Sequence, residues 1–249
     1  MSAGIDARTF HGDLVRLEPL TDDHVPGLAL AAEEDRSSFT YTMVPRAAGI
    51  AAYLQTLRSR AGATPFAQVR VADGAPVGCT AYFNPRTWPE RGDLSAVEIG
   101  GTWLAASAQR TGINAESKLL LMTYAFETLN VARVDFKTDA RNEPSRQSIE
   151  RLGARFEGVL RNWGPSWVPG EEGTLRDSAI FSVIAVEWPR VKSALTGRIR
   201  RLLSLTRTGE EGRLQRGGLA SPPCLGEADP LEPVVFLPVH HDFRAPRHL

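Results

Sequence analysis

Residues 97–129 carry two successive hydrophobic patterns. In residues 97–104 apolar and polar positions alternate as in a strand until Gly100 and Gly101 interrupt them, which indicates a bulge or a bend. After Gly112 the apolar positions follow helical spacing, which predicts a helix with one strongly apolar face. That face consists of Ala115, Leu119, Met122, Phe126 and Leu129.

Similar patterns predict strands and helices on both sides of this segment. We expect strands at residues 14–20, 66–71, 77–83, 133–138, 155–161 and 179–187, and helices at residues 21–34 and 45–60. A further helix opens at residues 141–146, with Pro144 in its first turn, and ends before Gly153. Asp73 and Gly74 fit a tight hairpin turn.

Two longer connections are predicted as loops. Residues 84–93 contain two prolines and mixed charges, and residues 162–177 contain Trp163, Trp167, two prolines and three glycines. The second loop is either a lid over the part of a site that receives the substrate or a surface loop anchored by its tryptophans.

Composition and charge narrow the classes of protein. The chain has 249 residues, of which 42% are hydrophobic and 23% charged, so it can bury one sizeable core. Its 29 basic and 29 acidic residues balance, so net charge gives no reason to expect DNA as a partner. Cys79 and Cys224 lie far apart, which argues against a disulfide scaffold or a structural metal site. Residues 1–13 form a lead without an apolar stretch, and no window reaches the roughly 18 apolar residues of a membrane span. We therefore expect a cytoplasmic protein without stable membrane insertion.

The C-terminal part changes in composition. Residues 189–207 form a basic amphipathic segment with six basic residues and no acidic one, which suits contact with a membrane, RNA or the protein itself. We favour a terminal helix docked on the protein. Residues 208–249 are rich in Gly, Pro and Arg and are predicted to be disordered. His240 and His241 lie there, and a stray pair is favoured over a metal site.

The connection between the bulged strand and the apolar helix suits a phosphate group. Gly112 allows a tight turn, so the free amides at the start of the helix can point at an anion, helped by the helix dipole. Arg110 adds a fixed charge with a fork of donors. The alternative is an ordinary strand-to-helix turn with a solvated arginine.

In context, this connection resembles the pyrophosphate loop of the GNAT superfamily of acetyl-CoA-dependent N-acyltransferases. The family loop reads Gln/Arg-x-x-Gly-x-Gly/Ala. Gln109 and Gly112 fit it, whereas Asn114 departs from it. The opening strand with its Arg and Pro, followed by Thr21, Asp23 and His24, resembles the RimJ/RimL-type branch. The resemblance covers residues 14–187.

The resemblance implies both a fold and a co-substrate. The fold is the α/β (α+β) GNAT acyl-CoA N-acyltransferase fold, a mixed central sheet splayed at a bulged strand and flanked by helices, here within residues 14–188. The co-substrate is acetyl-CoA, without a metal, and the partner is an amine acceptor. The oligomeric state stays open, a homodimer included. The residues implied to hold acetyl-CoA are Trp103 and Leu104 through their main chain, the loop residues Gln109, Arg110, Thr111, Gly112, Ile113 and Asn114, and Asn142.

The chemistry implied is direct attack of an amine on the thioester. Glu98 alternates with Val97 and Ile99, shares its side of the strand with Gly100 and is the candidate base; the alternative is a structural glutamate paired to an arginine. A backbone amide within residues 102–104, freed by the bulge, would polarise the thioester carbonyl. Ser145 is the candidate partner of the departing thiolate. The alternative is that Asn142 or Ser145 only caps the following helix.

Three functions remain in view. The first is an N-acetyltransferase acting on a protein N-terminal amine or a small amine. The second is an antibiotic- or polyamine-modifying acetyltransferase, which an acidic acceptor pocket would favour. The third belongs to a different class, a non-catalytic acyl-CoA-binding sensor or interaction module that would bind CoA without turnover.

Overall fold

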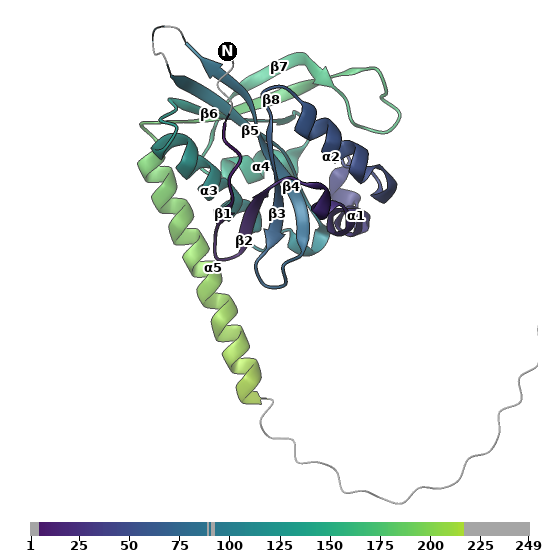
Figure 1. Cartoon of the computed structure of the whole chain (residues 1–249). Helices are drawn as coiled ribbons and strands as arrows, with labels where there is room; N and C mark the ends of the chain where they lie inside the picture. The colour runs from purple at the N-terminus through teal and green to yellow at the C-terminus, as the bar shows by residue number, and fades with distance from the viewer. Residues whose placement is uncertain (1–4, 89, 91–92, 217–249) are drawn as a thin grey trace, which may run out of the picture. The chain divides into compact units, whose positions relative to one another are not determined.

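The computed structural model describes residues 5–88, 90 and 93–216. Its centre is an eight-stranded sheet in the order β1-β2-β3-β4-β5-β6-β8-β7 (Figure 1). The strands are β1 Phe10–His11, β2 Val15–Pro19, β3 Thr64–Arg70, β4 Pro76–Thr87, β5 Leu94–Leu104, β6 Arg133–Asp139, β7 Arg155–Pro165 and β8 Leu175–Ile184. The α-helices are α1 Val25–Glu33, α2 Ile50–Ser59, α3 Ile113–Glu127, α4 Glu143–Glu150 and α5 Trp188–Arg216. Short 3₁₀ helices are η1 Asp22–His24, η2 Ser37–Phe39, η3 Ala47–Gly49 and η4 Ala106–Ala108.

The sheet separates between β5 and β6. These two strands are parallel and pair over three positions, from Ala96 opposite Arg133 to Glu98 opposite Asp135. Beyond Glu98, β5 continues to Leu104 without pairing with β6 in the described part of the chain. The predicted mixed sheet with a splayed centre is confirmed.

The bulge lies where the two glycines predicted it. On β4 and β5, Ala81 pairs with Gly100 but Cys79 pairs with Trp103, so β5 holds one residue more than β4 between these pairs. Gly101 absorbs the irregularity with φ of 59°, a backbone region that glycine adopts without steric cost. The extra residue reverses the side-chain alternation beyond it.

Helices cover both faces of the sheet. On the back face, the Tyr82 hydroxyl donates to the carbonyl of Leu121 in α3 at 2.5 Å, so Tyr82 and its strand partner Ile99 point toward that helix. On the front face, the ring of Phe83 lies under Arg60, the residue after α2, and Phe83 pairs with Glu98. Figure 1 shows α1 and α2 on the opposite side of the sheet from α3. Glu98 therefore faces the side of the sheet that α2 covers.

The first turns of α5 pack on α3. Trp188 stacks on Phe126 with ring centroids 5.2 Å apart, and Lys192 pairs with Glu127 at 2.7 Å. Apolar positions on this helix, Val191, Leu195 and Ile199, are buried. The predicted amphipathic segment thus docks on its own domain through its apolar side. The helix continues to Arg216, past the predicted boundary at residue 207. The rest of the predicted tail, with His240 and His241, lies outside the described residues.

The two predicted loops are shorter than expected. β4 runs on to Thr87 through Asn84, and β7 and β8 remain paired as far as Pro165 opposite Leu175. Asn84 and Asn162 each take a φ of 50°, which asparagine tolerates better than most residues and which lets a strand bend without ending. Pro165 is accommodated because β7 is an edge strand. No helix of the described residues is long and apolar enough to cross a membrane.

Candidate active site

The free edge of β5 and the start of α3 meet at the loop after η4. Arg110 and Gly112 both adopt left-handed conformations, with φ of 62° and 97°, and α3 begins at Ile113. Thr111 supports the turn by donating its hydroxyl to the carbonyl of Ala108 at 2.7 Å. The side chain of Arg110 is exposed. The Ile113 amide donates to the Thr111 hydroxyl at 3.4 Å. The next amides at the start of a long helix have no partner within the helix, an arrangement that fits a pyrophosphate.

Gln109 holds this loop to its surroundings. Its amide nitrogen donates to the carbonyl of Leu104 at 3.0 Å and to the hydroxyl of Ser38 at 2.9 Å. The glutamine side chain therefore joins the end of β5 to η2. Its contribution to ligand binding would come through the loop conformation that these bonds fix.

Asn114, which departs from the sequence pattern that the rest of the loop fits, connects two helices. Its side-chain nitrogen donates to the hydroxyl of Ser148 in α4 at 3.1 Å. Its side-chain oxygen is buried and has no hydrogen-bond partner among the described residues. A Gly or Ala at this position could not form the link, so the departure has a structural reason.

Trp103 and Leu104 lie at the end of β5, both with buried side chains. The Trp103 ring meets Phe39 edge-on, with centroids 6.0 Å apart. The main-chain carbonyl of Trp103 accepts a hydrogen bond from the Gln68 side-chain nitrogen at 3.2 Å. Their side chains are thus committed to the core, which leaves the main chain as the part that a ligand could contact.

Glu98 lies on the front face, one residue from the splay. Its side chain is 14% exposed, accepts from the amide nitrogen of Asn84 at 2.8 Å and pairs with Lys137 at 3.2 Å. A Cβ added at Gly100 would stand 3.2 Å from its carboxylate and 3.4 Å from the Phe83 ring, so the glycine allows Glu98 and Phe83 to lie close against the strand. The geometry is that of a carboxylate held in place by two donors beside Gly100. The ion pair with Lys137 is also what a structural role would give.

Asn142 and Ser145 lie at the start of α4. Asn142 is buried, and its side-chain oxygen accepts from the Ser145 amide at 3.2 Å, so it caps the helix. The Ser145 hydroxyl makes no hydrogen bond within residues 5–88, 90 and 93–216 and stays available to a ligand. The capping alternative therefore applies to Asn142 and leaves the hydroxyl of Ser145 without a structural task.

A buried polar cluster on the back face was not foreseen from the sequence. Lys118 in α3 is 3% exposed and donates to the hydroxyls of Thr80 and Thr102 at 2.8 and 2.7 Å. The two hydroxyls lie 3.0 Å apart. Thr80 belongs to β4, and Thr102 belongs to the bulged strand β5. Burial lowers the pKa of Lys118 to about 7.

The neighbouring α3 residue supports the same bulge. Ser117 donates to the Gln68 side-chain oxygen at 2.8 Å, and the Gln68 nitrogen donates to the carbonyls of Cys79 and Trp103 at 2.9 and 3.2 Å. We call these residues the back polar cluster: Gln68, Thr80, Thr102, Ser117 and Lys118. It braces both strands at the irregularity from which an amide would have to point at the thioester.

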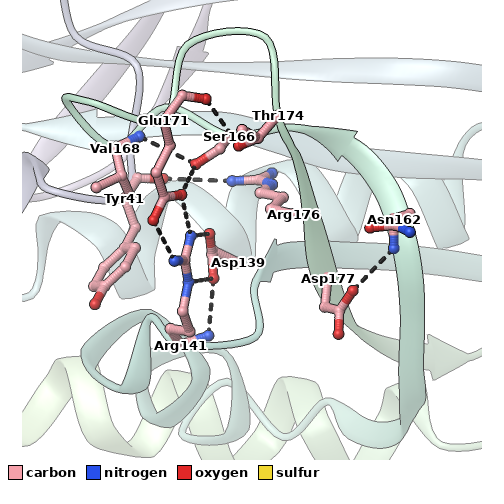
Figure 2. Close-up of polar contacts among 10 residues, drawn as sticks. All are labelled: Tyr41, Asp139, Arg141, Asn162, Ser166, Val168, Glu171, Thr174, Arg176 and Asp177. Atoms are coloured by element: carbon pink, nitrogen blue, oxygen red, sulfur yellow. Dashed lines mark hydrogen bonds and ion pairs between the residues drawn. The ribbon is translucent and has the colours of Figure 1, made fainter.

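A charged network on the front face was also not foreseen (Figure 2). Arg141 bonds both oxygens of buried Asp139, at 3.0 and 2.9 Å, and both oxygens of Glu171. Hydrogen bonds from Arg141 and then Ser166 lower the pKa of Glu171 to about 2. The Arg141 guanidinium also lies over the Tyr41 ring, 5.3 Å from its centre. These contacts attach the β7–β8 loop to β6 and to residues before α2.

Arg176 in β8 lies in the same region and completes the front charged cluster, which we define as Glu98, Lys137, Asp139, Arg141, Glu171 and Arg176. It donates to the carbonyl of Tyr41 at 3.4 Å. The cluster contains three carboxylates and three cations. It has no excess of negative charge that would select a polycation.

Two other features do not take part. Cys79 is fully buried and burial raises the pKa of its thiol, so it is poorly suited to act as a nucleophile. A hollow of about 570 Å³ lies along α5 between Glu127 and Arg200, and none of its lining residues belongs to the site above. The described residues contain no group of three or more His, Cys, Asp or Glu side chains arranged to hold a metal.

Comparison with known proteins identifies the family and the fold. A family model described as an acetyltransferase (GNAT) domain matches residues 15–155. The structure is similar to that of a GCN5-related N-acetyltransferase from Brucella melitensis, with a TM-score of 0.68 and 30% identity over 78% of this chain and 86% of that one. It also has the fold of Mycobacterium smegmatis RimJ in complex with CoA-disulfide, with a TM-score of 0.61 and 22% identity over 78% of this chain and 93% of that one. No curated protein matches the chain.

Proposed function

We propose that this chain, which belongs to the GNAT acetyltransferase family, transfers the acetyl group of acetyl-CoA directly to a primary amine in a ternary complex. The observation that carries the proposal is the position of Glu98. Its carboxylate lies beside the point where β5 leaves β6, on the face opposite α3. A base there can act on an amine while the donor occupies the strand edge.

The donor would be held by the start of α3 and the edge of β5. The loop from Gln109 to Asn114 fits the pyrophosphate through main-chain amides, and Arg110 supplies a charge at its rim. The edge of β5 at Trp103 and Leu104, which pairs with β4 but not with β6 among the described residues, would bond the pantetheine arm as a neighbouring strand would. Asn142, at the start of α4, would add a side-chain contact.

The proton transfers of the reaction give one role to the acceptor side of the site and another to the donor side. An amine attacks as its neutral form, so the proton of the ammonium passes to Glu98, directly or through a water. The new C–N bond forms as the C–S bond breaks. The nitrogen gives up its second proton as the amide forms, and the departing thiolate, which would accept a hydrogen bond from the Ser145 hydroxyl, takes up one proton and leaves as free CoA. The proton on Glu98 passes to solvent, so the overall reaction releases one proton.

The acceptor is a protein N-terminal amine or a small amine, as in the RimJ/RimL-type branch. The fold likeness to RimJ and the opening motif at Thr21 support this branch. An antibiotic- or polyamine-modifying activity receives less support, because the front charged cluster is balanced. A sensor without turnover would leave the Glu98 carboxylate without a reaction to catalyse.

The test is thiol release from acetyl-CoA by the purified full chain with N-terminal peptides, amino acids, polyamines and aminoglycosides as acceptors. Wild type, Glu98→Gln, Ser145→Ala and the surface control Glu150→Gln are compared. We expect turnover on a peptide or a small amine, with Glu150→Gln unchanged and both site variants slower. Tight CoA binding without turnover on any acceptor would contradict the proposal and favour the sensor.

A further inference from the structure

Arg176 has donors that the fold does not use. Among the described residues its guanidinium makes one hydrogen bond, to the Tyr41 carbonyl at 3.4 Å, although an arginine side chain carries five N–H groups. Its Nε atom is buried and has no partner. Figure 2 shows the side chain extending from β8 toward Tyr41, beside the Arg141 network. Arg176 therefore lies in the front charged cluster, but the cluster does not provide hydrogen-bond partners for most of its N–H groups.

The nearby carboxylates are already engaged. Asp139 and Glu171 are bonded by Arg141, and Glu98 pairs with Lys137. Arg176 forms no ion pair within 4.0 Å in the described part of the chain, and burial lowers its pKa while Asp139 and Glu98 act on it at longer range. A half-buried cation with unused donors is costly unless a ligand or solvent completes it.

We propose that Arg176 binds a carboxylate of the acceptor, and that the acceptor is a small amine that also carries a carboxylate, as an amino acid does. The inference rests on the proposed function and names the class of its acceptor. A planar guanidinium matches a carboxylate with two parallel hydrogen bonds. Glu98 and Arg176 belong to the same front charged cluster, and Glu98 acts on Arg176 electrostatically. The amine of the acceptor is therefore assigned to Glu98 and its carboxylate to Arg176.

The loops around Arg176 favour a small acceptor over a polypeptide. Tyr41 precedes α2, whereas Arg176 and Glu171 belong to the β7–β8 hairpin. The Arg176 bond to the Tyr41 carbonyl and the stacking of Arg141 on the Tyr41 ring tie these two segments across the front face. A polypeptide would have to pass this tie, whereas a single amino acid would not.

The experiment compares matched acceptors that differ in one group. A panel of amino acids and their carboxamides is assayed by thiol release with wild type, Arg176→Met, Arg176→Lys and the exposed control Arg161→Met. Since a carboxamide lowers the basicity of the neighbouring amine, the decisive quantity is the change in the acid-to-amide ratio of kcat/KM between proteins.

We expect Arg176→Met to reduce that ratio at least 10-fold from wild type, Arg176→Lys to retain part of it, and Arg161→Met to keep it. An arginine that only ties the loops would lower both activities alike and leave the ratio unchanged, which would overturn the proposal. Faster turnover of N-terminal peptides that lack a nearby carboxylate than of every amino acid would also overturn it.

Binding of products keeps the inference testable without turnover. Calorimetry measures N-acetyl amino acids and their carboxamides with CoA-saturated wild type and Arg176→Met. Tighter binding of the acids to wild type, lost in the variant, supports the carboxylate site even where acetyl transfer fails. Equal or absent binding of acids and amides to wild type contradicts it.

Discussion

The polar side chains on the two faces of the central strands are stabilised in different ways. On the back face Lys118 is buried with hydroxyls as its hydrogen-bond partners and forms no ion pair within 4.0 Å among the described residues. On the front face Glu98, Asp139 and Glu171 are each bonded to a cation. The back polar cluster is therefore a hydrogen-bonded brace, whereas the front charged cluster is a set of compensated charges.

The difference corresponds to two tasks in acyl transfer. A thioester carbonyl must meet an amide in a fixed position, and hydrogen bonds from Lys118 and Gln68 hold the bulge at which we propose that amide. An incoming amine must lose a proton, and we propose the Glu98 carboxylate as its acceptor. Changes on the front face should therefore affect turnover most, and changes on the back face should affect geometry and stability.

The largest effect is expected at Glu98. Glu98→Gln keeps the size and the bond from Asn84 but removes the proton acceptor, so kcat/KM should fall on the order of 100-fold or more while the affinity for CoA changes little. Steady-state kinetics and calorimetry with CoA measure the two quantities, with Glu150→Gln as the control. A loss of less than about 3-fold would show that Glu98 has a structural task only.

A smaller effect is expected at Gly112. Its φ of 97° is strained for alanine, and an added Cβ would stand 2.8 Å from Leu14 and 3.0 Å from Leu202. Gly112→Ala should cost about 1–2 kcal/mol of stability and turn the first amides of α3, weakening acetyl-CoA binding about 10-fold.

Gly74→Ala provides the matched control. Gly74 has a φ of 71° in the β3–β4 turn, and nothing lies within 4 Å of its added Cβ. The Gly74→Ala variant should lose about 1 kcal/mol of unfolding free energy without a change in CoA affinity. Equal CoA affinities for the two variants would contradict an anion site at the start of α3.

The smallest effect on turnover is expected at Lys118, where the change is one of stability and depends on pH. The folded pKa is about 7, whereas an unfolded lysine titrates near 10.4. Between these values the unfolded chain holds a proton that the folded chain has lost. Stability relative to Lys118→Met should therefore rise with pH in this window, by at most about 1.4 kcal/mol per pH unit.

Urea unfolding between pH 7.5 and 9.5 measures this difference. Lys192→Met, which removes a lysine paired with Glu127 at the surface, should show no comparable slope. A flat difference between wild type and Lys118→Met would mean that Lys118 remains charged in the folded chain.

The sequence predicted the donor side better than the acceptor side because the donor side is local. The bulge at Gly101, the turn at Gly112 and the cap at Asn142 each depend on a few consecutive residues, and the structure has all three. The Arg176 bond to Tyr41 joins residues 135 positions apart, and the Lys118 bond to Thr80 joins residues 38 apart. Such contacts depend on strand order and register, which the local pattern does not encode.

The two loops were predicted too long for a similar reason. Asn84 and Asn162 read as loop residues in sequence, but each lets a paired strand bend and continue. The extended β7–β8 hairpin in turn brings Arg176 and Glu171 to the front face. The acceptor side could therefore not be assembled before the pairing of these strands was known.

The most direct test of the account is an initial-rate matrix in which acetyl-CoA and the preferred acceptor are both varied. The two sides of the site predict that donor and acceptor are bound together, and burial makes the Cys79 thiol a poor carrier of the acetyl group. Double-reciprocal plots should therefore intersect, and each thiol released should match one acetylated amine. Parallel lines with a burst of thiol in the absence of acceptor would indicate an acetylated enzyme and would contradict direct transfer.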